Sequence, residues 1–344
     1  MPPGRFLVAA LLVAGCAATA PRPAQPERTP TPEEAIDGAR LATDIRFLAS
    51  DELLGRQAGS QSAEVAARYI AEQFRAAGVQ PVPGAEDGYF QTVEVPLGSG
   101  TSRNVVGAVR GTDADLRDEY VVLTAHYDHK GMLPGRVATT PDTVFNGARD
   151  NGMGTVAVLA AARAFAEAPP RRSVLLLAAA AEEVGLLGSR HFVEHPLVPL
   201  RQLVFALNVD TGGYSDTSIV TVVGLDRTTA GPLIRQGAAA FGLEAVPDPS
   251  PEQNLFDRSD NVRFARKGVP APTFSPGFRS FSDPGVVDYY HEVTDEVDDL
   301  DFEYLRRFAQ AYVRAARLIA DAPERPRWTP GDEYEEAGRA LYGE

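Results

Sequence analysis

The sequence predicts an α/β fold of three layers, in which helices cover both faces of a mixed, mostly parallel central sheet. Three apolar runs, at residues 120–124, 174–180 and 203–207, have the length and composition of buried parallel strands. Segments with helical spacing alternate with them, as in β-α-β units. Histidine or carboxylate residues follow each run, and the carboxyl ends of parallel strands meet at one edge of a sheet. We therefore expect these side chains to converge in one crevice.

The elements expected before the first of these runs are two helices and two short strands. Residues 33–50 and 60–77 have helical spacing, and Gly78 is placed to end the second helix. Residues 89–95 alternate apolar and polar side chains, and residues 104–109 form a second short β run. We expect these two strands to form an antiparallel edge of the sheet.

Helices and strands alternate through the rest of the chain. Residues 150–167 are rich in alanine, begin with an acidic residue and end before two prolines, which predicts a helix. Further helices are expected over residues 185–194, 228–241 and 298–321, and a further strand over residues 218–223.

The N-terminus has the composition of an export signal. One arginine precedes an apolar stretch at residues 6–13 that is too short to span a bilayer, and small residues follow it. Cys16 is the single cysteine of the chain, so an intrachain disulfide is excluded, and it stands where a bacterial lipoprotein signal places the residue to be acylated. We expect a lipid anchor at Cys16 that holds an exported protein on the cell envelope, at the periplasmic or surface face of the outer membrane. The alternative is ordinary signal cleavage near Ala18 or Ala20.

Composition divides the chain into four parts. We expect a lipoprotein signal at residues 1–15, a flexible tether rich in Pro, Ala, Thr and Arg at 16–32, one large α/β domain at 33–322, and a tail at 323–344. The tail is rich in proline and charge, so we expect it to drape over the surface or to stay mobile. A formal charge of −14 argues against nucleic acid and anionic lipid as partners.

Five short segments each offer a side chain that could bind a metal ion. Two imidazoles and three carboxylates, with one spare glutamate beside them, match the needs of two hydrolytic zinc ions. Two cations about 3.5 to 4 Å apart need a bridging carboxylate, and Asp150, in a glycine-rich loop that opens a helix, is the candidate. The candidate residues are His126, Asp150, Glu182, Glu183, Asp210 and His291.

Neighbouring residues suggest further roles. Side chains that are adjacent on an extended segment point apart, so one of Glu182 and Glu183 could bind metal while the other faces the attacking water. Asp128 follows His126 by two positions and could accept a hydrogen bond from the far ring nitrogen of that histidine. The next two residues, His129 and Lys130, are expected to be solvated loop residues.

The order and spacing of these segments resemble the aminopeptidases with two co-catalytic zinc ions, of the aminopeptidase Y and bacterial leucyl aminopeptidase type. The resemblance covers roughly residues 41–319 and differs from the family at Gly152-Met153-Gly154 and at Asn261. The motifs that carry it are residues 47–56, His126-Tyr127-Asp128, Asp150-Asn151, Glu182 through Ser189, Asn208-Val209-Asp210 and Tyr290-His291.

The resemblance implies a role for each residue of the site. One zinc ion would take His126 and Asp210, the second would take Glu183 and His291, and Asp150 would bridge them. The resemblance also implies that the peptide bond from Asp150 to Asn151 is cis, that Glu182 is the general base and that Asp128 orients His126. Tyr290 stands one residue before a ligand and could donate its hydroxyl to the tetrahedral oxyanion.

The expected activity is removal of N-terminal residues from peptides with a free N-terminus, by a water activated by two zinc ions. Acidic surroundings, including the stretch at residues 292–301, would hold the protonated N-terminus. Two alternatives stay open: a glutaminyl-cyclase-like acyltransferase with a single zinc ion, and a non-enzymatic binding protein on the same scaffold. The run from Glu182 to Ser189 favours the hydrolase, and the filled ligand positions count against loss of catalysis.

Overall fold

The structure is a computed structural model that describes residues 1, 4, 29–96, 100–133, 142–210 and 212–344. The chain divides into two compact units, residues 1–30 and 31–344. Cys16 and the expected signal lie outside the described residues. Within the described residues, no helix combines the length and the apolar composition needed to cross a membrane.

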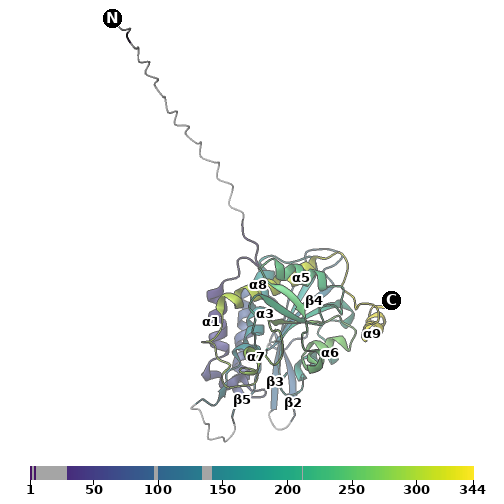
Figure 1. The fold of residues 1–344 in the computed structure, drawn as a ribbon. Helices are drawn as coiled ribbons and strands as arrows, with labels where there is room; N and C mark the ends of the chain where they lie inside the picture. The colour runs from purple at the N-terminus through teal and green to yellow at the C-terminus, as the bar shows by residue number, and fades with distance from the viewer. Residues whose placement is uncertain (2–3, 5–28, 97–99, 134–141, 211) are drawn as a thin grey trace. The chain divides into compact units, whose positions relative to one another are not determined.

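A mixed sheet forms the centre of the second unit (Figure 1). Its strand order is β1-β3-β7-β4-β8-β11-β9-β10. The remaining strand of the sheet, β2, also pairs with β3. A separate hairpin pairs β5 with β6. The strands are β1 (Gln80–Pro81), β2 (Phe90–Val95), β3 (Gly100–Val109), β4 (Tyr120–His126), β5 (Gly131–Met132), β6 (Val144–Phe145), β7 (Ser173–Ala179), β8 (Leu203–Val209), β9 (Ile219–Val223), β10 (Glu244–Pro247) and β11 (Thr273–Pro276).

The middle of the sheet is parallel and one edge is antiparallel, as the sequence predicts. β4 lies between β7 and β8 and is parallel to both, and β8 is parallel to β11. β2 and β3 form the expected antiparallel edge. β11 was not predicted, because four residues that end in Pro276 show no strand periodicity. It separates β8 from β9 and pairs with β9 in the antiparallel sense.

Among the described residues, the six predicted helices are present with several ends shifted, and three further short helices were not predicted. The helices are α1 (Gly38–Leu48), α2 (Gln61–Ala77), α3 (Gly154–Glu167), α4 (Leu187–Glu194), α5 (Gly231–Ala239), α6 (Asn261–Ala265), α7 (Pro284–Val287), α8 (Phe302–Asp321) and α9 (Glu335–Tyr342). The first begins at residue 38 because the Asp37 side chain caps it by accepting the N–H of Ala39 at 2.8 Å. The third begins at residue 154 because Ala148–Met153 form a separate wide turn, which carries Asp150.

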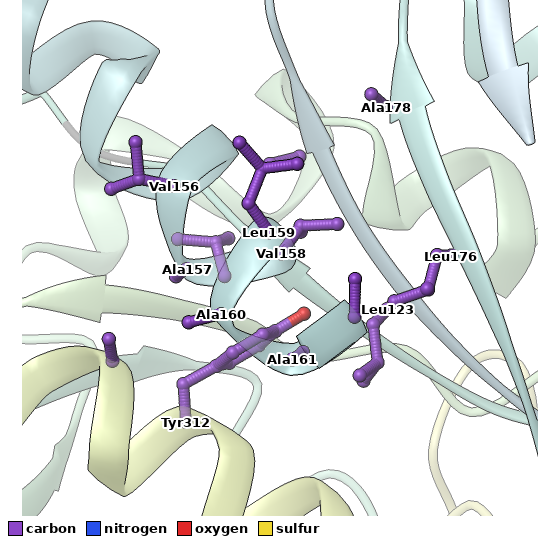
Figure 2. Packing of buried hydrophobic residues seen from close by; sticks show 14 of the residues in the cluster. Leu123, Val156, Ala157, Val158, Leu159, Ala160, Ala161, Leu176, Ala178 and Tyr312 are labelled. Atoms are coloured by element: carbon purple, nitrogen blue, oxygen red, sulfur yellow. The ribbon is translucent and has the colours of Figure 1, made fainter. Parts of the chain in front are cut away.

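Side chains of the central strands alternate between two apolar cores, one on each face of the sheet. Leu123 of β4 and Leu176 and Ala178 of β7 pack with the alanine-rich α3 and with Tyr312 of α8, as Figure 2 shows. The next residues along the same strands belong to the second core, with Phe192 of α4 and Phe264 of α6. A sheet with both faces buried under helices needs strands that are apolar throughout. The predicted three-layer αβα class is therefore confirmed.

The C-terminal tail packs against the domain. Trp328 forms a β-bridge with Thr228, and its ring lies with that of Tyr334 around Phe256, at centroid distances of 6.4 and 6.0 Å from Phe256. The guanidinium of Arg227 stands 4.0 Å from the centroid of the Phe256 ring. Of the two states expected for the tail, the structure shows the packed one. Phe256 belongs to a short 3₁₀ helix, η5 (Leu255–Arg258), so the tail supports a segment that reaches the site described next.

Candidate metal centre

The carboxyl ends of the parallel strands bring the predicted residues together. His126 is the last residue of β4, and Asp210 follows β8 directly. Glu182 and Glu183 follow β7, which lies next to β4 in the sheet. The remaining two candidates, Asp150 and His291, come from the wide turn before α3 and from the segment after α7.

The side chains form two groups that share Asp150. In the first group, Nε2 of His126 lies 3.3 Å from Oδ1 of Asp150 and 3.4 Å from Oδ1 of Asp210. In the second, Nε2 of His291 lies 3.3 Å from Oδ2 of Asp150 and 3.2 Å from Oε2 of Glu183. The two carboxylate oxygens of Asp150 thus face different groups. This is the arrangement that a carboxylate between two cations requires.

His129 is also part of the second group, so the expectation of a solvated side chain is wrong. The side chain is buried, and its Nδ1 lies 2.8 Å from Oε1 of Glu183 and 4.0 Å from Oδ2 of Asp150. The main chain of His129 forms a β-bridge with Gln57. Lys130 is half-buried and places Nζ 3.0 Å from Oε2 of Glu183. The signal available in the sequence was the position of His129, three residues after His126.

The turn that carries Asp150 is held from several sides. The peptide bond between Asp150 and Asn151 is cis, which confirms the expectation drawn from the resemblance. The buried Asp295 carboxylate accepts the main-chain N–H of Asp150 at 2.9 Å, and Asn151 Nδ2 donates to the carbonyl of Val209 at 2.8 Å. Gly147 opens the turn at φ 59°, where a Cβ would clash with the carbonyl oxygen of Asp150. These contacts tie the bridging candidate to the end of β8.

A buried arginine fastens the N-terminal segment to the same loops. Arg56 is 1% exposed and donates to the carbonyls of Tyr127 at 2.7 Å, Asn146 at 2.6 Å and Gly147 at 3.0 Å, and also to that of Leu48. Burial lowers the pKa of Arg56 to about 10, so the guanidinium remains charged at neutral pH. Its fixed fork of five donors suits several carbonyls at once. Apart from the resemblance over residues 47–56, no sequence pattern predicted this role of Arg56.

Asp128 contributes to the site differently from the sequence expectation. Nδ1 of His126 hydrogen-bonds the main-chain oxygen of Asp128 at 3.1 Å, while the nearer Asp128 carboxylate oxygen stands 3.9 Å from it. That carboxylate instead accepts the main-chain N–H groups of Glu182 at 3.1 Å and Glu183 at 3.4 Å. Ala181, directly before these two glutamates, has a positive φ of 55°. Asp128 thus forms hydrogen bonds with His126 through its main chain and with the main chain of Glu182 and Glu183 through its carboxylate.

The electrostatics of the cluster separate the two adjacent glutamates. Burial raises the pKa of Glu182 well above its usual value; the charge of His126 opposes this shift, and Asp210 and Asp260 add to it. The pKa of Glu183 is lowered, because its contacts with His129 and His291 outweigh the effect of burial. Of the two adjacent glutamates, Glu182 therefore has the higher proton affinity and Glu183 the lower.

The donor set fits zinc. His nitrogens and carboxylate oxygens are its usual ligands in hydrolytic sites. Nδ1 of His129 and Oε1 of Glu183 are buried and lie 2.8 Å apart without the geometry of a hydrogen bond, and the buried Nε2 of His129 has no hydrogen-bond partner among the described residues. Buried polar atoms without a partner call for an explanation, and a bound cation supplies one.

The cluster opens into a crevice of about 350 Å³. Glu182 and Tyr290 line it together with the candidate ligands. The Tyr290 ring stacks on His291 at a centroid distance of 3.9 Å, and its hydroxyl accepts a hydrogen bond from Nη2 of Arg258 at 3.2 Å. A smaller cavity of about 70 Å³ adjoins the crevice, and aromatic, aliphatic, hydroxyl and charged side chains line it. Asp210, Arg258 and Tyr290 line both spaces.

The surroundings of the cluster are of mixed charge, whereas the sequence suggested acidic ones. None of residues 292–301 belongs to the lining of the crevice, and Asp295 lies beneath the site. Three basic side chains do line it, those of Lys130, Arg258 and Arg263. The acidic stretch supports the turn from below instead of facing the crevice.

Comparison with known proteins gives the family. Residues 104–316 match the model described as Peptidase family M28. Aminopeptidase YwaD of Bacillus subtilis is 28% identical over 232 residues, which cover 66% of this chain and 47% of YwaD. The chain thus spans less than half the length of that relative.

Solved structures share the fold. The LapA aminopeptidase of Legionella pneumophila has a TM-score of 0.63 and 21% identity, over 85% of this chain and 74% of LapA. A glutaminyl cyclase of Bacteroides thetaiotaomicron has a TM-score of 0.64 and 17% identity, over 84% of this chain and 99% of the cyclase. At these identities the likeness concerns the fold and does not separate the two activities. The family match covers more than half of the chain, so the chain belongs to peptidase family M28, as the resemblance in its sequence predicts.

Proposed function

We propose that the protein is a zinc aminopeptidase that removes residues from the free N-terminus of peptides. The observation that carries the proposal is the position of Asp150, whose two oxygens face two separate groups of His and carboxylate donors. The membership in a peptidase family and the similarity to aminopeptidase YwaD support it.

Five side chains would hold the metal ions. We assign His126 and Asp210 to the first zinc ion, Glu183 and His291 to the second, and Asp150 to both. His291 is preferred to His129 because its Nε2 is 3.3 Å from Asp150, whereas Nδ1 of His129 is 4.0 Å away. When bound, a zinc pair lowers the pKa of a water molecule and polarises the scissile carbonyl.

Glu182 is the general base of the proposed reaction. It lines the crevice but belongs to neither of the two groups of donors. Its raised pKa makes the carboxylate a stronger base than an exposed glutamate. Glu182 takes a proton from the attacking water and passes it to the leaving amine.

Tyr290 is placed to stabilise the oxyanion. Because Nη2 of Arg258 donates to the Tyr290 hydroxyl oxygen, the hydroxyl proton is free to point toward a substrate. Burial raises the pKa of Tyr290, so the hydroxyl keeps this proton at neutral pH. A donor directed at developing negative charge lowers the barrier of acyl transfer.

Product analysis tests the proposal. Peptides with a free N-terminus and their N-acetylated forms are incubated with the zinc-loaded protein, and the products are identified by mass spectrometry. We expect stepwise loss of single residues from the free N-terminus and no reaction of the acetylated peptides. Internal cleavage, cleavage from the C-terminus or equal cleavage of acetylated peptides would refute an aminopeptidase.

A further inference from the structure

We propose that the crevice selects substrates with a carboxylate close to the scissile bond, and that Arg258 and Arg263 bind this carboxylate. The inference rests on the proposed function and names the substrate class of the same site. The carboxylate is either the C-terminus of a dipeptide or the side chain of an Asp or Glu residue. Both sources present the same planar group to a guanidinium.

Arg258 is an exposed guanidinium without an acidic partner. Its Nη1 donates to the carbonyl of Gln253 at 3.3 Å and its Nη2 to the hydroxyl of Tyr290 at 3.2 Å. Within the part of the chain that the structure describes, no carboxylate lies within 4.0 Å of it. Arg258 lines both the crevice and the adjoining cavity, so it stands beside the position of the scissile bond. These contacts leave donors of the fork free for a ligand, because a guanidinium carries five N–H groups.

Arg263, on α6, is the second such group. Its Nη2 donates to the carbonyl of Gly185 at 3.1 Å, and its buried Nε has no hydrogen-bond partner among the described residues. No described carboxylate lies within ion-pair distance of this guanidinium either. Lys130, the third basic side chain of the lining, is in contrast paired with Glu183. A partly buried cation without an acidic partner is costly, and an anionic substrate group would offset this cost.

The charge of the crevice agrees with an anionic ligand. The lining carries five carboxylates, at Asp150, Glu182, Glu183, Asp210 and Asp257, and three basic side chains. Two divalent zinc ions would therefore leave the crevice with a net positive charge. The carboxylate of Asp257, next to Arg258 in sequence, accepts hydrogen bonds from the Asn254 amide at 3.2 Å and from the Tyr334 hydroxyl at 3.5 Å.

Geometry limits how far the carboxylate can be from the bond that is cleaved. An extended peptide advances about 3.5 Å per residue, so only groups one or two residues from the scissile bond stay inside the crevice. The C-terminus of a dipeptide and the side chain of the first or second residue meet this condition. The C-terminus of a long peptide does not.

The test compares matched substrates with and without the carboxylate. Leu-Ala is compared with Leu-Ala-amide for the C-terminal source, and Glu-Ala-amide with Gln-Ala-amide for the side-chain source. The variants are Arg258→Gln, Arg263→Gln and the double variant, with the exposed Arg201→Gln, outside the crevice lining, as control. We expect wild type and the control to favour the carboxylate member of at least one pair by about tenfold or more in kcat/KM. The double variant should treat both members alike, through a higher KM for the carboxylate substrate.

Other outcomes separate this inference from the proposed function. Cleavage of Leu-Ala-amide by the wild type measures the aminopeptidase activity on a substrate that has no carboxylate. If no peptide is cleaved, the proposed function fails, and calorimetric titration of the same pairs into zinc-loaded protein still measures the preference. Equal binding or turnover of both members of both pairs by wild type would overturn the inference, as would a preference that survives in the double variant. A uniform loss of kcat in Arg258→Gln with unchanged preference would show that Arg258 acts only through Tyr290.

Discussion

At the scale of single residues, two adjacent glutamates have different proposed tasks. Glu182→Gln should keep both zinc ions and lose activity by on the order of 10²-fold or more, because an amide cannot accept the proton of the water. Glu183→Gln should lose zinc, because it removes a charged donor of the second group. Zinc content by mass spectrometry and kcat on one peptide measure both effects. The exposed Glu194→Gln, on α4, is the matched control.

Two results would contradict this division of labour. The first is nearly full activity of Glu182→Gln, which would exclude it as the base. The second is loss of zinc from Glu182→Gln with retention of zinc by Glu183→Gln, which would exchange the two roles.

The two candidate histidine ligands predict how zinc binding depends on pH. Burial tends to lower the pKa of His291, but Asp150 and Glu183 raise it to about 9 in the metal-free protein. Burial likewise tends to lower the pKa of His126. Glu182 and other carboxylates raise it more strongly, so the pKa of His126 is well above its usual value. A histidine must be neutral to bind metal, so protons compete with zinc. Zinc affinity should therefore fall as pH decreases below about 9 and should be highest above it.

Competition with a chelator of known affinity across this pH range measures the effect. His191→Ala, which alters a histidine on α4 outside the crevice, should leave the profile unchanged. An affinity that does not change with pH would show that the two histidines are neutral before zinc binds.

The sequence identified the residues whose positions follow from strand ends, and it missed those whose roles depend on burial. His126, Glu183 and Asp210 end or follow apolar runs, so their convergence follows from a parallel sheet. His129 is buried and pairs through a β-bridge with Gln57 from a distant loop, which no local pattern records. Arg263 lies outside every motif that pointed to metal binding, and its place in the crevice depends on how α6 packs.

At the scale of elements, the tail and η5 form one packed unit. Trp328→Ala should lower the free energy of unfolding by about 3–5 kcal/mol, because it empties a site filled by a buried aromatic ring. It should also raise KM, since Phe256, which packs against Trp328, lies in the 3₁₀ helix that ends at Arg258. Urea denaturation and steady-state kinetics measure the two effects, with Trp328→Phe as the conservative control. Unchanged stability and KM in a chain truncated before Pro323 would show that the tail is dispensable.

Long apolar elements were predictable, and short ones were not. The runs at 120–124 and 174–180 are short and apolar except for Thr124, and such runs of this length favour buried strands. β11 and α9 gain their structure from distant partners: β11 from β8 and β9, and the tail from Trp328 against Phe256. The tail sequence alone therefore left a packed and a mobile state equally open.

At the scale of the whole molecule, we propose that the protein is exported and anchored to the cell envelope by lipid at Cys16. The basis is the sequence before Cys16, which lies outside the described residues. Cys16→Ala should move the protein from the membrane fraction to the soluble fraction, and mass spectrometry of the wild-type N-terminus should find a lipid-modified cysteine. An unmodified Cys16, or a mature protein that begins after it, would contradict the anchor.

We propose that two zinc ions act in this crevice to hydrolyse the N-terminal peptide bond. The most direct measurement is a zinc titration of the metal-free protein with a peptide that begins with glutamine, in which bound zinc and products are followed together. We predict two zinc ions bound per chain, with activity that reaches its maximum at two, and release of free glutamine. One zinc ion per chain with formation of an N-terminal pyroglutamyl peptide would contradict the account and identify a cyclase instead. Zinc binding with no change to the peptide would contradict an enzymatic role altogether.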